Sequence, residues 1–174
     1  YTEIVTLPFN SNGYDLVYQR CCRNPSIINI NVPEDSGATF TTQIPPGPIT
    51  EENSCPQFTN FPPVALCANA DFWFDHSAID IDGDYLIYDF CSPMLGGTPD
   101  APAPAPPSPP PFTPVSWAGG FSEWDPITSV NPFTIDESTG LLEGTPTQVG
   151  QYVIGICVSE YRNGILLSTT NRDF

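Results

Sequence analysis

The sequence predicts an all-β fold, a β-sandwich preceded by a partial β unit. The chain of 174 residues contains 22 prolines and 13 glycines, and both residue types disrupt the interior of a helix. The segments between them are rich in Ile, Val, Thr, Tyr and Phe, whose side chains suit a pleated sheet. Hydrophobic residues make up 40% of the chain, so we expect a packed core rather than general disorder.

The first part of the chain, residues 1–55, combines strand-like segments with a proline-rich connector. The expected strands are residues 2–7, 14–21 and 38–44, with the turn sequences NG and DSG between them. Three strands make one sheet, whose apolar face this part of the chain cannot cover by itself. We therefore expect a partial β unit that other residues complete.

Residues 56–174 are expected to form a complete small sandwich with a proline-rich insertion at about 98–114. The expected strands are bounded by turn residues, and they are residues 64–67, 72–77, 85–91, 133–135, 151–159 and 165–170. The insertion, TPDAPAPAPPSPPPFTP, predicts an extended, polyproline-like loop. We expect it to pack on its own sandwich, and the alternative is a ligand for a groove-binding domain.

The chain is strongly acidic, with 20 Asp and Glu residues against four basic ones and a net charge of -16. Such a charge repels phosphate backbones and anionic lipid, so nucleic acid and membrane surfaces are not expected partners. The sequence also lacks an apolar run of about 18 residues, so we expect no membrane insertion. Cations are the natural partners, although an acidic surface can also serve solubility alone.

The strongest local signal for a binding site is the sequence SAIDIDGDYLIY at residues 77–88. Asp80, Asp82 and Asp84 alternate around a glycine, which directs several carboxylate oxygens to one point. Ca²⁺ needs such a set, because it takes about six to eight oxygen ligands. Asp75 lies just upstream and is a further candidate ligand. The alternative is a solvated acidic turn, where Asp and Gly are common, but carboxylates this close repel each other without a cation.

Six cysteines are candidates for disulfides: Cys21, Cys22, Cys55, Cys67, Cys91 and Cys157. The sequence has no CxxC pair and a single histidine, which excludes a zinc site of the usual Cys and His spacing. The even number predicts disulfides and an oxidising, extracellular compartment. Because Cys21 and Cys22 are adjacent, we expect them to bond to two different partners. By strand order, Cys67 and Cys91 fall at the end opposite the acidic loop, and we expect them to pair.

The acidic loop resembles the A-x-D-x-D-G-D-x-L-x-Y loop of cadherin-like and related immunoglobulin-like repeats. Downstream, FTIDESTGLLEGTPTQVG is similar to the I-D-x-x-T-G-x-L-x-G-T-P-x-x-x-G run of such repeats. A wider resemblance rests on YDLVYQRCCRN, SPPPFTPVSW and YVIGICVSEYRNGILLSTTNRDF. These segments look like parts of large Bacteroidetes cell-surface proteins, of the type IX-secreted adhesins associated with gliding motility.

The resemblance implies an immunoglobulin-like or cadherin-like sandwich in a secreted, repetitive surface protein, and we expect the chain to be a segment of such a protein. In that family geometry, loop 80–84 and turn 160–164 lie at the same end, so Glu160 is a further expected ligand. Cadherins also use an acidic linker between domains, for which Glu51 and Glu52 are candidates. The D-x-N-D-N form of that linker is absent from this sequence.

The sequence predicts a structural or adhesive module stiffened by Ca²⁺ and disulfides, and no enzyme. It contains no G-x-S-x-G motif, and Asp75, His76 and Ser77 are consecutive strand residues that point to opposite faces. Glycans or other cell-surface ligands are the further partners that this interpretation allows. The alternative function is a carbohydrate-binding module, because the aromatic rings of Trp117, Phe121 and Trp124 offer flat faces to sugars. Those rings equally suit a core-covering role.

We also expect neighbouring copies or repeats to associate head to tail. The sheet of residues 1–50 is incomplete, and the sequence ILLSTTNRDF at 165–174 is strand-like to its end. A neighbour that completes this sheet by strand addition produces a filament or beaded array. The alternative is that residues 1–50 fold back onto the second half of the same chain.

Overall fold

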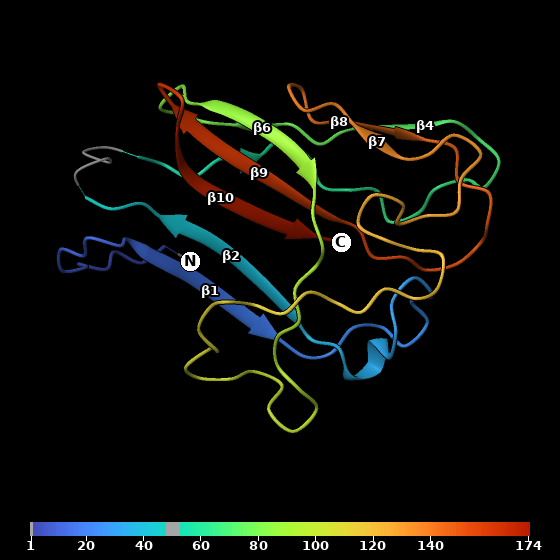
Figure 1. Ribbon diagram of the computed structural model, residues 1–174, viewed down its shortest axis with the longest axis horizontal. Helices are drawn as coiled ribbons and strands as arrows, with labels where there is room; N and C mark the ends of the chain where they lie inside the picture. The colour runs from blue at the N-terminus through green and yellow to red at the C-terminus, as the bar shows by residue number, and fades with distance from the viewer. Residues whose placement is uncertain (1, 48–52) are drawn as a thin grey trace.

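A computed structural model describes residues 2–47 and 53–174, and its described part is all-β, as predicted (Figure 1). The strands are β1 (Tyr14–Arg20), β2 (Ala38–Ile44), β3 (Gln57–Phe58), β4 (Phe72–Asp75), β5 (Ala78–Ile79), β6 (Tyr85–Phe90), β7 (Thr134–Ile135), β8 (Leu141–Gly144), β9 (Gly155–Arg162) and β10 (Ile165–Asp173). One 3-10 turn among the described residues, η1, spans Pro33–Asp35. Within the described residues no helix has the length and apolar character needed to cross a bilayer.

Two three-stranded antiparallel sheets enclose the main hydrophobic core. One has the strand order β10-β9-β6 and the other β4-β8-β7. Phe90 of β6, Ile156 of β9 and Leu142 of β8 are buried in this core, and Phe74 of β4 packs against it. The two sheets are therefore the layers of a β-sandwich. The immunoglobulin-like or cadherin-like topology stays a prediction.

Several strands match the predicted segments, and the mismatches have local causes. β2 spans residues 38–44, as predicted, and β6 ends one residue before the predicted 91. β9 begins at Gly155 rather than at residue 151, because Val153 donates its N–H to Asn29 Oδ1 at 3.0 Å. β8 was not predicted, because LLEG is too short to show a period.

Two predicted strands are absent from the described residues. Residues 64–67 form no strand, because the preceding Pro62 and Pro63 have no N–H to donate to a ladder, and Val64 is fully exposed. Residues 2–7 are also outside every sheet, although their sequence is β-prone.

The two-stranded sheet of β1 and β2 packs against the second half of the same chain. β2 lies beside β10 (Figure 1), and the hydroxyls of Thr42 and Thr170 share a hydrogen bond of 2.8 Å. Arg23 forms an ion pair of 2.5 Å with Asp173, and both side chains are over nine-tenths buried. Contacts thus cross the predicted boundary near residue 55, in the fold-back arrangement considered above. Association with neighbouring copies stays a proposal.

The proline-rich insertion contacts the C-terminal end of β1. The backbone N–H of Cys21 donates to the Pro102 carbonyl at 2.8 Å, and the Ser108 N–H donates to Gln19 Oε1 at 2.8 Å. Gln19 and Thr39 are buried beneath the segment that leads into the insertion. The loop is packed within its own chain, as expected, but on β1 and β2 rather than on the sandwich.

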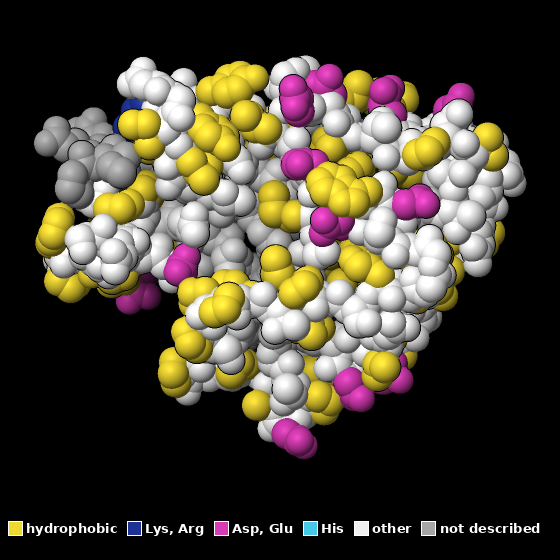
Figure 2. Space-filling model, in the orientation of Figure 1, with side chains coloured by type: hydrophobic (Ala, Val, Ile, Leu, Met, Phe, Trp, Pro, Cys, Tyr) yellow, Lys and Arg dark blue, Asp and Glu magenta, His cyan; other side chains and the backbone are white. Residues whose placement is uncertain are grey.

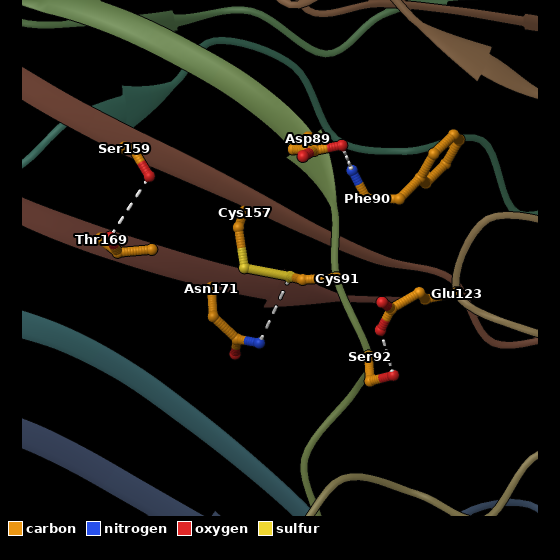
Figure 3. Close-up of a disulfide and its surroundings, with 9 residues drawn as sticks. All are labelled: Asp89, Phe90, Cys91, Ser92, Glu123, Cys157, Ser159, Thr169 and Asn171. Atoms are coloured by element: carbon orange, nitrogen blue, oxygen red, sulfur yellow. Dashed lines mark hydrogen bonds between the residues drawn. A yellow bond between two sulfur atoms is a disulfide. The ribbon is translucent and has the colours of Figure 1, made fainter.

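The disulfide pairing differs from the prediction. Cys91, just after β6, is bonded to Cys157 of β9, with their Cα atoms 5.8 Å apart (Figure 3). The expected pair of Cys67 with Cys91 is therefore wrong. β6 and β9 are neighbours in one sheet, whereas Cys67 precedes β4 of the other sheet and is exposed and free.

The adjacent cysteines also pair differently from the expectation. Cys21 and Cys22 are bonded to each other across a cis peptide bond, not to two separate partners. Cys55 remains free and half-buried, and its sulfur accepts a hydrogen bond from the Thr42 hydroxyl at 3.3 Å. Four of the six cysteines are thus paired.

Candidate metal centre

Loop 80–84 folds around the carboxylate of Asp80. Asp80 Oδ1 accepts the backbone N–H groups of Asp82 at 2.9 Å and of Asp84 at 3.1 Å. Gly83 has a φ of 80°, a conformation that glycine adopts without strain. One carboxylate oxygen each from Asp80, Asp82 and Asp84 lies within 4.8 Å of the other two. The three predicted aspartates therefore do converge.

Two buried carboxylate oxygens at this end of the sandwich have no hydrogen-bond partner among the described residues. They are Asp80 Oδ2 and Glu160 Oε1. The Glu160 residue is 0% exposed and lies opposite Leu86 in the β6–β9 ladder. Its second oxygen, Oε2, accepts a hydrogen bond from the Ser168 hydroxyl at 2.7 Å. Because buried polar atoms are nearly always paired, these two oxygens are acceptors that suit a cation.

The electrostatics place Glu160 beside the aspartates. Burial is the main cause that raises the pKa of the Glu160 carboxyl, and the nearby carboxyls of Asp84 and Asp80 raise it further. The side chains of Ser168 and Asn53 act in the opposite direction. Glu160 thus lies near Asp84 and Asp80, although it is not among the three carboxylates that meet within 4.8 Å, and its charged form needs a positive neighbour.

Arg162 supplies one positive charge at the edge of the cluster. Its guanidinium donates from Nε to Asp84 Oδ1 at 2.7 Å and from Nη2 to Asp84 Oδ2 at 2.5 Å. This pairing is the main cause that holds the pKa of Asp84 below its usual range. The Asp84 side chain is 4% exposed, so the ion pair is well shielded from water on that side. Arg162 therefore pairs directly with Asp84, and its charge also acts on the nearby carboxyls of Asp82 and Glu160.

The donor set selects a hard cation. The side chains that meet here offer carboxylate oxygens, and Asn53 adds an amide group beside Glu160 and Arg162. Oxygen donors of this kind suit Ca²⁺, Mg²⁺ or Mn²⁺, whereas softer metals take nitrogen and sulfur. A set of several carboxylates that can bind through one or two oxygens matches the larger Ca²⁺ ion better than the strict octahedron of Mg²⁺.

The other predicted ligands, Asp75, Glu51 and Glu52, are not among the described carboxylates that meet in this cluster. Asp75 Oδ1 accepts the Ser77 N–H at 3.0 Å, and hydrogen bonds with Ser77 lower the pKa of Asp75. Asp75 does not belong to the group of carboxylates that meet within 4.8 Å. Glu51 and Glu52 lie outside the described residues.

Sequence reasoning missed three residues that build the site. Arg162 faces the same side of β9 as Glu160, two residues earlier, and it sits next to the Tyr85–Tyr161 pair at the end of the ladder. Asn53 accepts a hydrogen bond from Arg162 Nη2 at 3.0 Å, and the Ser54 N–H donates to Asp82 Oδ2 at 2.5 Å. The period of β9 could have identified Arg162, but nothing local in the sequence marks the connector residues.

The aromatic residues proposed for sugar binding have separate environments. Trp117 packs against the buried Ile30, and its Nε1–H donates to the Ser92 hydroxyl at 3.1 Å. The Phe121 ring contacts the Tyr152 ring at 6.0 Å between centroids. Trp124 is 55% exposed. Trp117 and Phe121 are thus engaged in packing, which leaves Trp124 as the exposed ring of the three.

Comparison of this chain with models of protein families, with curated proteins and with solved structures finds no match.

Proposed function

We propose that this chain is a structural, non-enzymatic module of an extracellular surface protein, and that it binds Ca²⁺ at Asp80, Asp82, Asp84 and Glu160. The observation that carries the proposal is the pair of buried, unpartnered oxygens on Asp80 and Glu160 beside two further carboxylates. A cation there stabilises charges that otherwise repel. The Cys91–Cys157 disulfide is compatible with an extracellular location.

The ion would act as a rigid joint between separate parts of the chain. Loop 80–84 precedes β6, and Glu160 belongs to β9. The backbone N–H of Ser54, in the connector, donates a hydrogen bond to Asp82. A ligand that holds these parts together binds the folded chain and not the unfolded one, so it adds directly to stability. This role fits an adhesive or filament-forming surface protein, in which each module bears mechanical load.

Calorimetric titration of the metal-free chain with Ca²⁺ tests this function. We expect one site, with Mg²⁺ binding more weakly. Glu160→Gln should abolish or greatly weaken binding, because it removes a buried charge from the ligand set. Glu143→Gln is the matched control, since Glu143 is an exposed acid on β8, and it should bind as the unaltered chain does. An unaltered chain that shows no heat of binding and no change in melting temperature with excess Ca²⁺ would contradict the metal site.

A further inference from the structure

An apolar groove of about 500 Å³ opens on one side of the sandwich. Segment 62–66 forms one wall, Val149 and its neighbours form another, and the core residues Phe72, Phe74 and Ile154 form part of the floor. No charged side chain is among its lining residues, in a chain that carries 20 acids. The groove therefore suits a segment with apolar side chains.

The chain itself carries a mostly apolar segment in the sequence TEIVTLPF, residues 2–9, whose one charged residue, Glu3, lies near its start. Ile4, Val5 and Phe9 are 94%, 65% and 77% exposed. Apart from the Pro8 carbonyl, which accepts the Tyr14 hydroxyl at 2.6 Å, the segment makes no hydrogen bond to the described residues. Figure 2 shows hydrophobic side chains exposed over this end of the molecule, at the left. An extended apolar segment with an unpaired backbone is a template for strand pairing.

The segment and the groove lie at opposite ends of the molecule. The chain between the N-terminus and β1 lies in the left part of Figure 1, whereas β4 and β8, which contribute lining residues to the groove, lie at the right. The segment of one copy is therefore placed to meet the groove of another copy.

We propose that residues 2–9 of a second copy of this chain occupy the apolar groove. In an extended strand, alternate side chains share a face, so Val5, Leu7 and Phe9 point together into the groove. β4 is an edge strand of its sheet and can accept an added strand beside Phe72 and Phe74. The contact is head to tail and does not close on itself, so it propagates as a filament. This inference names the partner of the structural module and rests on that proposed role.

Three variants of the full chain, each with aspartate at an exposed apolar position, test the proposal. The strand variant is Val5→Asp with Leu7→Asp, the groove variant is Val149→Asp, and the control is Val130→Asp. Val149 and Val130 are 89% and 72% exposed, so neither substitution disturbs the core, and Val130 does not line the groove. Each chain is examined by analytical ultracentrifugation in Ca²⁺ from micromolar to millimolar protein.

The unaltered chain and the control should form concentration-dependent oligomers, while the strand and groove variants should stay monomeric. A mixture of these two variants should form a one-to-one dimer, because one retains a working groove and the other a working strand. A labelled peptide of residues 2–9 should bind the strand variant at least tenfold more tightly than the groove variant.

The inference is wrong if the unaltered chain stays monomeric throughout, or if the strand and groove variants assemble as the control does. It is also wrong if the mixture of the two variants forms no dimer, or if the peptide binds both variants equally. Cross-links between residues 2–9 and the groove within a monomer would overturn it too. The Ca²⁺ titration of the same variants separates the two claims. Normal Ca²⁺ binding without assembly refutes only the second-copy contact, and assembly without Ca²⁺ binding refutes only the metal site.

Discussion

The β6–β9 strand pair is fastened at both ends, but by different chemistry. At one end the ladder finishes at Tyr85 and Tyr161, next to the carboxylates of the candidate metal centre. At the other end Cys91 and Cys157 form a covalent bond (Figure 3). The covalent fastening is unaffected by ions, whereas the carboxylate end places like charges together and depends on its counter-charge. One strand pair therefore has a covalent cross-link at one end, and at the other end a charged cluster whose stability depends on neighbouring positive charge.

The largest expected effect is on the covalent end. Cys91→Ser with Cys157→Ser opens a loop with a sequence separation of 66 residues, and chain entropy predicts a loss of about 4 kcal/mol in unfolding free energy. Chemical denaturation under non-reducing conditions measures it. Cys67→Ser, at the exposed free thiol, is the control and should leave stability unchanged. Equal midpoints for the double variant and the control would show that the disulfide does not fasten the sheet.

Acid should lower the stability of the fold through His76, which belongs neither to the disulfide nor to the carboxylate cluster. His76 is 1% exposed among the rings of Phe58, Phe74 and Phe174. Burial lowers the pKa of His76 from 6.5 to about 4, with Arg172 acting in the same direction. The unfolded chain takes up this proton first as pH falls. The contribution of His76 to the unfolding free energy is therefore fully present well above pH 6.5. It decreases by about 3 kcal/mol as the pH falls to 4.

The variant His76→Phe isolates this contribution from that of the acidic residues. It keeps an aromatic ring in the pocket and removes the titrating group. The difference in unfolding free energy between the unaltered chain and the variant should change between pH 7 and pH 4. A difference that stays constant over this range would mean that His76 is not buried as a neutral ring.

Calcium should stabilise the fold by an amount that does not depend on the disulfide. Free Ca²⁺ at about 100 times its Kd adds about 2.7 kcal/mol to the unfolding free energy. The same increment should appear in the cysteine double variant, because distant sites contribute additively. A Ca²⁺ increment that disappears with the disulfide would show that the two ends act as one unit.

The smallest expected effect concerns Arg162. Its side chain is 30% exposed, so solvent screening should keep the contribution of its ion pair with Asp84 to the metal-free fold small. Arg162→Gln should lower the melting temperature slightly at low salt and hardly at all at high salt. A loss of several kcal/mol would mean that Arg162, and not a metal ion, is the main counter-charge of the cluster.

Local sequence was enough to predict the acidic loop but not its surroundings. The alternation of Asp80, Asp82 and Asp84 around a glycine is a local property, and so is the strand pattern of β2. Glu160 was placed through the resemblance to cadherin-like repeats, because its approach depends on which strands are neighbours. Arg162 has the same dependence and was missed.

The errors share the same physical origin. The choice of Cys157 over Cys67 as the partner of Cys91 depends on sheet order, which a strand pattern does not contain. Residues 2–7 have the composition of a strand but no partner strand among the described residues, and composition alone cannot reveal this. Propensity describes what a segment can form, while pairing decides what it does form.

The chain uses most of its few cationic side chains internally. Of its four basic residues, Arg23 is paired with Asp173, Arg162 with Asp84, and Arg172 lies over the Phe58 ring at 4.6 Å. Two copies that approach each other therefore meet as polyanions, and their long-range repulsion decays over a Debye length of about 10 Å at 0.1 M salt. Contacts between copies should consequently strengthen as ionic strength rises, the reverse of assemblies held together by surface ion pairs.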